Sequence, residues 1–138
     1  MEKLRSPLPL VSSEQAPHAS GPYSRSILAD AAAGSRGFLS GSIALSPMTG
    51  PRVAGGDVRA TTEQATKNQT AVRATAGCRS APVVKTWHSL ADRADCRTVR
   101  AIYRSARPAR HHPARAAVQV ADQPHGACTV VNAIAAQA

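Results

Sequence analysis

Apolar and polar residues alternate clearly in one stretch of the chain that we expect to form a strand. Near the C-terminus, residues 118–120 alternate with a period of two, which is typical of a half-buried strand and predicts one over residues 114–121. A turn around residues 124–126 and an apolar run over residues 128–135 complete a predicted C-terminal hairpin.

A second hairpin is predicted near the N-terminus. Its strands are residues 24–29 and 37–45, and the turn-rich residues 31–36 join them. Residues 82–90 predict a separate strand near the middle of the chain.

Two helices are predicted from their ends. Asp57 is a suitable N-cap, and Gly77, about twenty positions later, is a suitable residue to end the first helix in a left-handed conformation. The residues expected to face inward are Val58, Ala65, Val72 and Ala76. The neighbouring positions, where a packed helix would carry leucine, hold Thr61, Thr66, Asn68 and Gln69. The buried face of this helix is therefore unusually polar.

The second helix is expected to start at Asp92 and to run to about Ala106, with Val99, Ile102 and Tyr103 facing inward. The predicted order is then two strands, helix, strand, helix and two strands. This order favours an α+β fold, in which two helices pack on one face of a mixed sheet.

The length of 138 residues favours one domain, which we expect over residues 14–138 after a flexible N-terminal lead over residues 1–13. The chain holds 28 alanines but only 23 residues of Leu, Ile, Val and Phe together, so its core must be thin and would gain from burial between subunits. No stretch approaches the length of a membrane span, and we expect a cytoplasmic protein.

The net charge of +9 raises the question of a polyanionic partner. Most arginines are scattered and aromatic residues are few, so nucleic acid is the less favoured partner. Five arginines nevertheless follow a helical spacing along the second predicted helix: Arg93, Arg97, Arg100, Arg104 and Arg107. Like charges at this spacing repel one another, so this arginine stripe should face water or meet anions.

No cofactor or metal is expected. The three cysteines, Cys78, Cys96 and Cys128, are far apart and form no CxxC pair, so neither a disulfide framework nor a zinc site is indicated. His125 and Cys128 would supply only two ligands.

Arg115 is the best candidate for a functional residue. It follows Pro113 and Ala114 at the start of a predicted strand, where proline favours an extended backbone. A guanidinium stays charged at working pH and offers a planar set of donors that match two carboxylate oxygens. This position therefore suits the binding of a small organic acid.

Four stretches in the same order resemble the Rid family, the reactive-intermediate deaminases also called YjgF-type proteins. They are APHASGPYS at residues 16–24, SGSIALSPMTG at 40–50, VVKTWHSLADRAD at 83–95 and PARAAVQVA at 113–121. The resemblance implies a chorismate-mutase-like fold and a homotrimer with clefts between subunits. It also implies hydrolysis of reactive 2-imino and 2-enamino acids to 2-keto acids and ammonia.

By this resemblance, Arg115 matches the arginine that binds the substrate carboxylate. Tyr23 and Ser40 match further substrate-binding positions, and Ala117 stands at one where the family has cysteine. The chain departs from the family at Val130, which replaces a glutamate that orients the attacking water. This change removes a general base, worth roughly 10²–10⁴-fold in rate. The alternative function is a non-catalytic protein that binds small acids or regulates another enzyme.

Two further positions depart from the family pattern. Arg100 stands where the family has an asparagine, and Asn132 stands where it has an acid before the closing apolar residues.

Overall fold

The computed structural model describes residues 10–11, 13–19, 21–31, 34–46, 57–78, 82–106 and 112–136. Its strands are β1 (Leu10–Val11), β2 (Ser26–Ala31), β3 (Gly34–Ser42), β4 (Val83–Leu90), β5 (Ala114–Gln119) and β6 (Thr129–Ala136). Its helices are α1 (Val58–Thr75) and α2 (Cys96–Ser105), with 3₁₀ turns η1 (Arg93–Asp95) and η2 (Pro124–Gly126).

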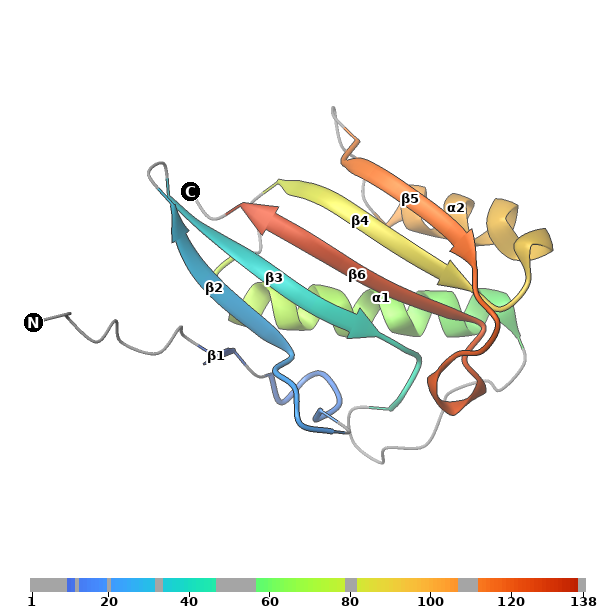
Figure 1. The fold of residues 1–138 in the computed structure, drawn as a ribbon, viewed down its shortest axis with the longest axis horizontal. Helices are drawn as coiled ribbons and strands as arrows, with labels where there is room; N and C mark the ends of the chain where they lie inside the picture. Colours follow the sequence, from blue (N-terminus) through green and yellow to red (C-terminus); the bar gives the residue numbers. More distant parts are fainter. Residues whose placement is uncertain are drawn as a thin grey trace, which may run out of the picture.

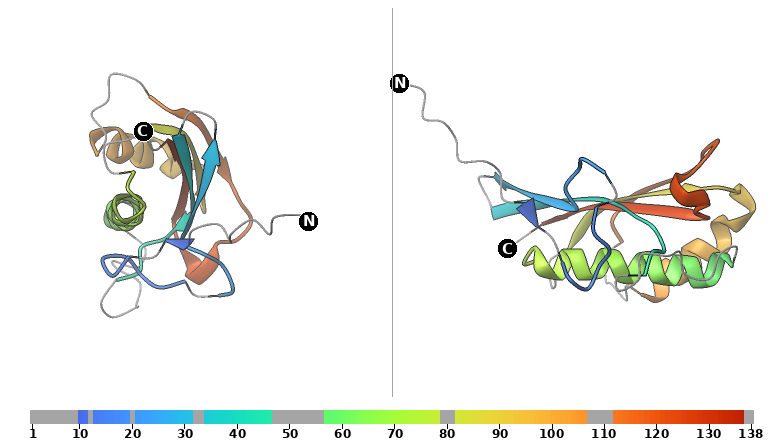
Figure 2. Two further views of the ribbon diagram at one scale, coloured as in Figure 1. Left: turned by 90° about the vertical axis from the view of Figure 1, so that its left-hand side faces the viewer. Right: turned by 90° about the horizontal axis from the view of Figure 1, so that it is seen from below.

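The strands form one mixed sheet in the order β1-β2-β3-β6-β4-β5, in which β4 and β5 are parallel and the other pairs are antiparallel. Both helices lie on one side of this sheet and leave the other side open (Figure 1; Figure 2). The predicted α+β fold, with two helices on one face of a mixed sheet, is confirmed.

The predicted C-terminal hairpin is wrong. β5 pairs in parallel with β4 and lies at the edge of the sheet, whereas β6 inserts between β3 and β4. A period of two identifies a strand but not its partner. The burial of every second residue along β6 suits a central strand covered by a helix, while β5 has no fully buried residue.

The N-terminal hairpin is confirmed, with strands of the predicted lengths that lie two and three residues closer to the turn. Ala31 and Gly34 are already paired, so the turn is tighter than the predicted residues 31–36. Gly34 has a φ of 99°, a conformation that glycine adopts without strain. Within the lead predicted over residues 1–13, Leu10–Val11 pair with β2, and residues 1–9 and 12 lie outside the described part.

The predicted ends of α1 are confirmed. The Asp57 side chain accepts a hydrogen bond from the backbone N–H of Arg59 at 2.9 Å, which satisfies one of the free donors of the first turn. At the other end Gly77 has a φ of 73°. Asp92 likewise caps η1, which leads into α2, by accepting from the N–H of Ala94 at 2.8 Å.

Threonines on the buried face of α1 satisfy their hydroxyl groups within the helix. Thr61, Thr62 and Thr66 donate to the carbonyl oxygens of Asp57, Val58 and Thr62 at 2.7, 2.6 and 2.8 Å. A hydroxyl that is bonded to its own helix leaves the methyl group for packing. α1 can therefore bury these side chains although they are polar.

Two amides on the same face bond to the sheet side of the molecule instead. The Asn68 Nδ2 donates to the carbonyl oxygens of Ile43 and Leu45, both at 2.9 Å, and the Gln69 Nε2 donates to that of Val131 at 3.1 Å. Because a buried amide needs hydrogen-bond partners, these bonds hold α1 against β6 and against the segment after β3.

The apolar part of the core is thin, as predicted. Its main cluster between α1 and the sheet consists of Ala16, Leu39, Val72, Ala76, Cys78 and Ala135. Most of these side chains are small and contribute little apolar area. Within the described residues, no helix is long and apolar enough to cross a bilayer.

Candidate functional site

Arg115 lies on the edge strand β5, on the side of the sheet that the helices cover. Its Cα pairs with that of Thr86 in the parallel neighbour β4, so the two side chains point to the same face. Thr86 is fully buried under the helix layer, whereas Arg115 is half-buried. Among the described residues, no hydrogen bond or ion pair engages the Arg115 guanidinium, which leaves its donors available for a ligand.

Helix α2 covers this part of the sheet and is fixed to it at two points. The Arg93 N–H donates to Oε1 of Gln119 at 2.9 Å, which ties η1, the turn that leads into α2, to the end of β5. The ring of Tyr103 meets that of the buried His88 edge to face, with 4.7 Å between ring centroids. Ala117 pairs with His88 and so lies on the same covered face as Arg115.

Tyr23 and Ser40 lie together at another part of the sheet. Tyr23 is 44% exposed and precedes β2. The Ser40 hydroxyl donates to the carbonyl oxygen of Ser24, and the Ser40 N–H donates to that of Arg25 at 2.9 Å. Ser40 therefore holds the chain next to Tyr23 in place, and its hydroxyl can still accept a hydrogen bond.

The sheet order keeps Arg115 apart from Tyr23 and Ser40. Ser40 is on β3 and Arg115 is on β5, with β6 and β4 between them. Adjacent strands lie about 4.8 Å apart, so these residues are separated by roughly 14 Å across the sheet. One subunit therefore does not bring the predicted ligand-binding residues together around one small molecule.

Val130 occupies a tight position on β6. A Cβ atom added to Gly41 would lie 2.7 Å from Val130 Cγ1, so glycine is needed there to make room for the valine. Gly41 falls in an irregularity of the β3–β6 pairing between Leu39 and Ser42. No carboxylate stands at this position.

Two residues without a predicted functional role, Lys85 and Trp87, lie on the open face of the sheet. The Lys85 ammonium lies 4.4 Å from the centre of the Trp87 ring, and the two residues are two apart on β4. Trp87 pairs with Asn132 on one side and with Ala116 on the other. The sequence already indicates this contact, because residues two apart on a strand share a face and cations bind aromatic rings.

The pKa values of Arg73 and Cys78 are shifted, and burial is the main cause in both cases. Burial lowers the pKa of Arg73, and the nearby Tyr103 and Cys78 oppose that shift. Burial also raises the pKa of the Cys78 thiol, although the Arg73 guanidinium lowers it. Cys78 packs in the apolar cluster, so its thiol is shielded and poorly reactive.

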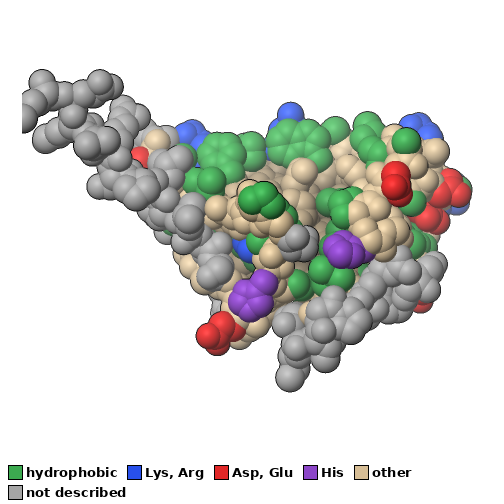
Figure 3. Space-filling model, turned by 60° about the horizontal axis from the view of Figure 1, so that its bottom comes forward, with side chains coloured by type: hydrophobic (Ala, Val, Ile, Leu, Met, Phe, Trp, Pro, Cys, Tyr) green, Lys and Arg blue, Asp and Glu red, His purple; other side chains and the backbone are tan. Residues whose placement is uncertain are grey.

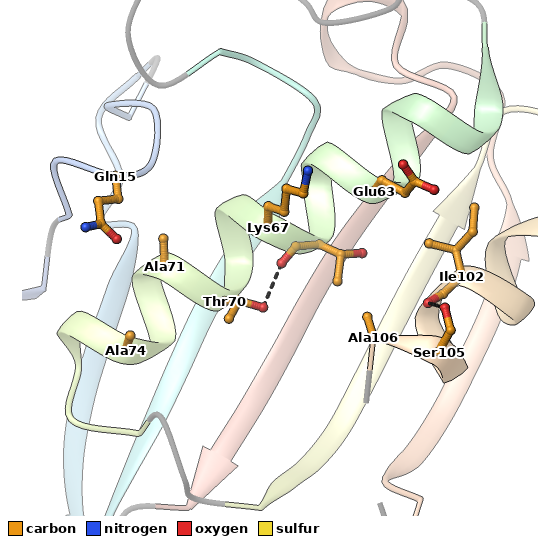
Figure 4. Close-up of a pocket in the computed structure, with 10 residues that line it drawn as sticks. Gln15, Glu63, Lys67, Thr70, Ala71, Ala74, Ile102, Ser105 and Ala106 are labelled. Carbon is orange, nitrogen blue, oxygen red and sulfur yellow. Dashed lines mark hydrogen bonds between the residues drawn. The ribbon is translucent and has the colours of Figure 1, made fainter. Parts of the chain in front are cut away.

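A groove of about 480 Å³ lies on the outer side of the molecule, between α1 and α2 (Figure 4). Its lining includes Glu63, Lys67 and Ala71 from α1, and Ile102 and Ser105 from α2. None of the predicted site residues lines it. Across the described ranges, no group of three His, Cys, Asp or Glu side chains is placed to hold a metal ion.

The sequence and the fold agree with one family. The family model described as Endoribonuclease L-PSP matches residues 13–137, so the chain belongs to this family, the YjgF or Rid family. The resemblance found in the sequence is thereby confirmed.

Two relatives and one solved structure are similar to this chain over most of its length. The chain is 40% identical over 128 residues to the human 2-iminobutanoate/2-iminopropanoate deaminase, covering 93% of this chain and 89% of that protein. It is 42% identical over 126 residues to the chloroplastic Reactive Intermediate Deaminase A of Arabidopsis thaliana, covering 91% of this chain and 64% of that protein. The crystal structure of E. coli TdcF with bound serine superposes with a TM-score of 0.82 at 28% identity, covering 94% of this chain and 99% of that one.

Proposed function

We propose that the chain hydrolyses reactive 2-imino and 2-enamino acids to 2-oxo acids and ammonia, without a cofactor. The observation that carries the proposal is the half-buried Arg115 on the edge strand, which no described residue engages. The names of the human and Arabidopsis relatives support this chemistry. The bound serine in the related TdcF structure supports a site for a small amino or imino acid.

In this mechanism, Arg115 binds the substrate carboxylate through two parallel N–H donors and so fixes the imine carbon. Water adds to that carbon, the C–N bond breaks, and the nitrogen leaves as ammonia. The protonated imine is already a strong electrophile, so the protein mainly has to hold the substrate and exclude bulk water. Tyr23 and Ser40 would line the pocket, and the small Ala117 would leave room beside Arg115.

Because one subunit separates Arg115 from Tyr23 and Ser40, the proposal includes a homotrimer whose clefts combine residues from two chains. The open face of the sheet supports association. Phe38 and Val118 on this face are 45% and 53% exposed. In Figure 3, hydrophobic side chains gather along the upper part of the molecule, over the sheet. Large exposed apolar side chains that gather on one face favour an interface between subunits.

Light scattering should therefore give three times the mass of one chain for the wild type. Val118→Asp should lower this mass to that of one chain, because a carboxylate would be buried without a partner in the interface. Ala101→Asp, an exposed position on α2, should leave the mass unchanged. A wild-type protein that runs as a monomer would contradict the shared cleft.

Val130 supports a second candidate function, a small-acid-binding protein without turnover, because valine cannot orient water. Wild type should release ammonia from 2-iminobutanoate faster than the spontaneous reaction if the chain is an enzyme. Val130→Glu should then raise the rate by at least about 10-fold, since a general base contributes roughly 10²–10⁴-fold.

Val130→Gln is the matched control, because it has the shape of glutamate but cannot take a proton. If wild type binds 2-oxobutanoate but gives only the spontaneous rate, and Val130→Glu hydrolyses the imine, the binding function is correct. Equal rates for Val130→Glu and Val130→Gln would show that a carboxylate at this position does not act as the general base.

The remaining expectations from the sequence are also part of this proposal. We place a single domain over residues 14–138 and the protein in the cytoplasm. A nucleic-acid partner remains the less favoured alternative, although four of the five arginines of the stripe, Arg93, Arg97, Arg100 and Arg104, are exposed as predicted. Arg107 lies outside the described residues.

A further inference from the structure

The arginine face of α2 points toward the edge of the sheet, away from α1. Residues of a helix are spaced by about 100°, which places Arg97, Arg100 and Arg104 on one side of α2. The opposite side carries Ile102 and, at the end of the helix, Ala106, which line the groove shared with α1 (Figure 4). Since α1 lies on that side, the arginines must lie over the free edge, where β5 is the last strand (Figure 1).

Arg100 lies level with Arg115 along this edge. The hydrogen bond of 2.9 Å between the Arg93 N–H and Gln119 Oε1 places the start of η1 level with the end of β5. Distances along both elements can be counted from this level. From Gln119 back to Arg115, four strand residues at about 3.3 Å span roughly 13 Å. From Arg93 to Arg100, three residues of 3₁₀ turn at about 2.0 Å and four of helix at about 1.5 Å span roughly 12 Å. Because α2 connects two parallel strands, it runs back along β5, and both distances point the same way.

This end of the edge is positively charged without compensation from its own elements. The segments that form it, α2, β5 and the neighbouring strand β4, contain no acidic residue. The described acids nearest in sequence, Asp92, Asp95 and Asp122, flank the other end, near Gln119. Two guanidiniums on long side chains at the same level suit a ligand with two negative groups better than one with a single carboxylate.

We propose that Arg100 and Arg115 together select dicarboxylic 2-imino and 2-oxo acids. Arg115 binds the carboxylate next to the reacting carbon, and Arg100 binds the distal carboxylate. This inference rests on the proposed function and names its substrate class. With 2-iminosuccinate, water adds to the imine carbon, the C–N bond breaks, and oxaloacetate and ammonia are formed, so no oxidant or reductant is needed.

The test compares kcat/KM for 2-iminosuccinate, made in situ from L-aspartate by an aspartate oxidase, with kcat/KM for 2-iminobutanoate. The ratio of the two should fall by about 10-fold in Arg100→Ala, since one charge-assisted interaction with the distal carboxylate is lost. Arg100→Lys should retain part of the preference because it keeps the charge. The matched control is Arg93→Ala, which removes the same charge at the far end of the stripe and should leave the ratio unchanged.

Binding gives a readout that does not depend on turnover. Calorimetry should show that wild type binds oxaloacetate more tightly than 2-oxobutanoate, and that Arg100→Ala removes the difference. If wild type hydrolyses 2-iminobutanoate but the ratio of the two kcat/KM values is the same in all variants, the inference of a dicarboxylate substrate is wrong. The proposed imine hydrolysis then still stands. A ratio that falls equally in Arg93→Ala would reflect net charge and would also overturn the inference of a dicarboxylate substrate. If wild type hydrolyses neither imine and binds neither oxo acid, the proposed function itself fails.

Discussion

Replacing Arg115 with alanine is expected to lower kcat/KM for 2-iminobutanoate by about 100-fold or more. Two charge-assisted hydrogen bonds to a carboxylate contribute roughly 1.5–3 kcal/mol each, and every 1.4 kcal/mol corresponds to about tenfold. The loss should appear in both KM and kcat, because the same contact holds the substrate and aligns its imine carbon. The measurement is ammonia release with the spontaneous rate subtracted.

Two controls separate this effect from damage to the fold. No described residue engages the Arg115 guanidinium, so the alanine variant should keep the mass and the unfolding midpoint of the wild type. Arg115→Lys keeps the charge but loses the planar pair of donors, so its kcat/KM should fall between those of wild type and Arg115→Ala. Wild-type kcat/KM in a folded Arg115→Ala variant would rule out this arginine as the carboxylate anchor.

Asn68→Ala is expected to lower the free energy of unfolding by about 1–3 kcal/mol, because it removes two hydrogen bonds that tie α1 to the segment after β3. The carbonyl oxygen of Leu45 loses the amide donor, whereas that of Ile43 keeps the N–H of Leu45 at 2.9 Å. Asn68 is 1% exposed, and its Nδ2 donates to the carbonyls of Ile43 and Leu45. These carbonyls belong to the segment that follows β3, so the change should also loosen the neighbourhood of Ser40. Urea unfolding at a fixed protein concentration measures the difference, since association contributes to stability.

Gln64→Ala is the matched control for this prediction. The Gln64 Nε2 donates to Asn68 Oδ1 at 2.9 Å from a half-buried position, so its loss should cost less than about 1 kcal/mol. If the free energy of unfolding of Asn68→Ala lies within about 0.5 kcal/mol of the wild-type value, the amide does not hold the two segments together.

Asn68 also begins an N-x-T sequence. Because its side chain is buried, this sequence should not accept a glycan in the folded protein.

The helices could be predicted from the sequence because their signals are local. The cap at Asp57, the glycine at Gly77 and the cap at Asp92 act on backbone groups within a few residues. The outward arginines and the inward Val99 of α2 follow from a single helical period. The partner of a strand is not a local property, so the sequence alone does not show that β6 pairs with β3 and β4 rather than with β5.

The polar face of α1 shows a second limit. The sequence indicates that Asn68 and Gln69 replace expected apolar residues, but it does not reveal their acceptors. These are carbonyls 23, 25 and 62 residues away, and only the folded chain brings them into reach. The site residues Arg115, Tyr23, Ser40 and Ala117 stay predictions, since the resemblance identifies them but one subunit does not join them.

The small side chains in the core have a consequence for the way the protein responds to temperature. The heat capacity change of unfolding grows with the apolar area that becomes exposed, and polar area reduces it. A core in which threonine, asparagine and alanine fill places usually held by leucine exposes little apolar area. The free energy of unfolding of each subunit should therefore vary weakly with temperature and have a shallow maximum. Cold denaturation should occur only at an unusually low temperature.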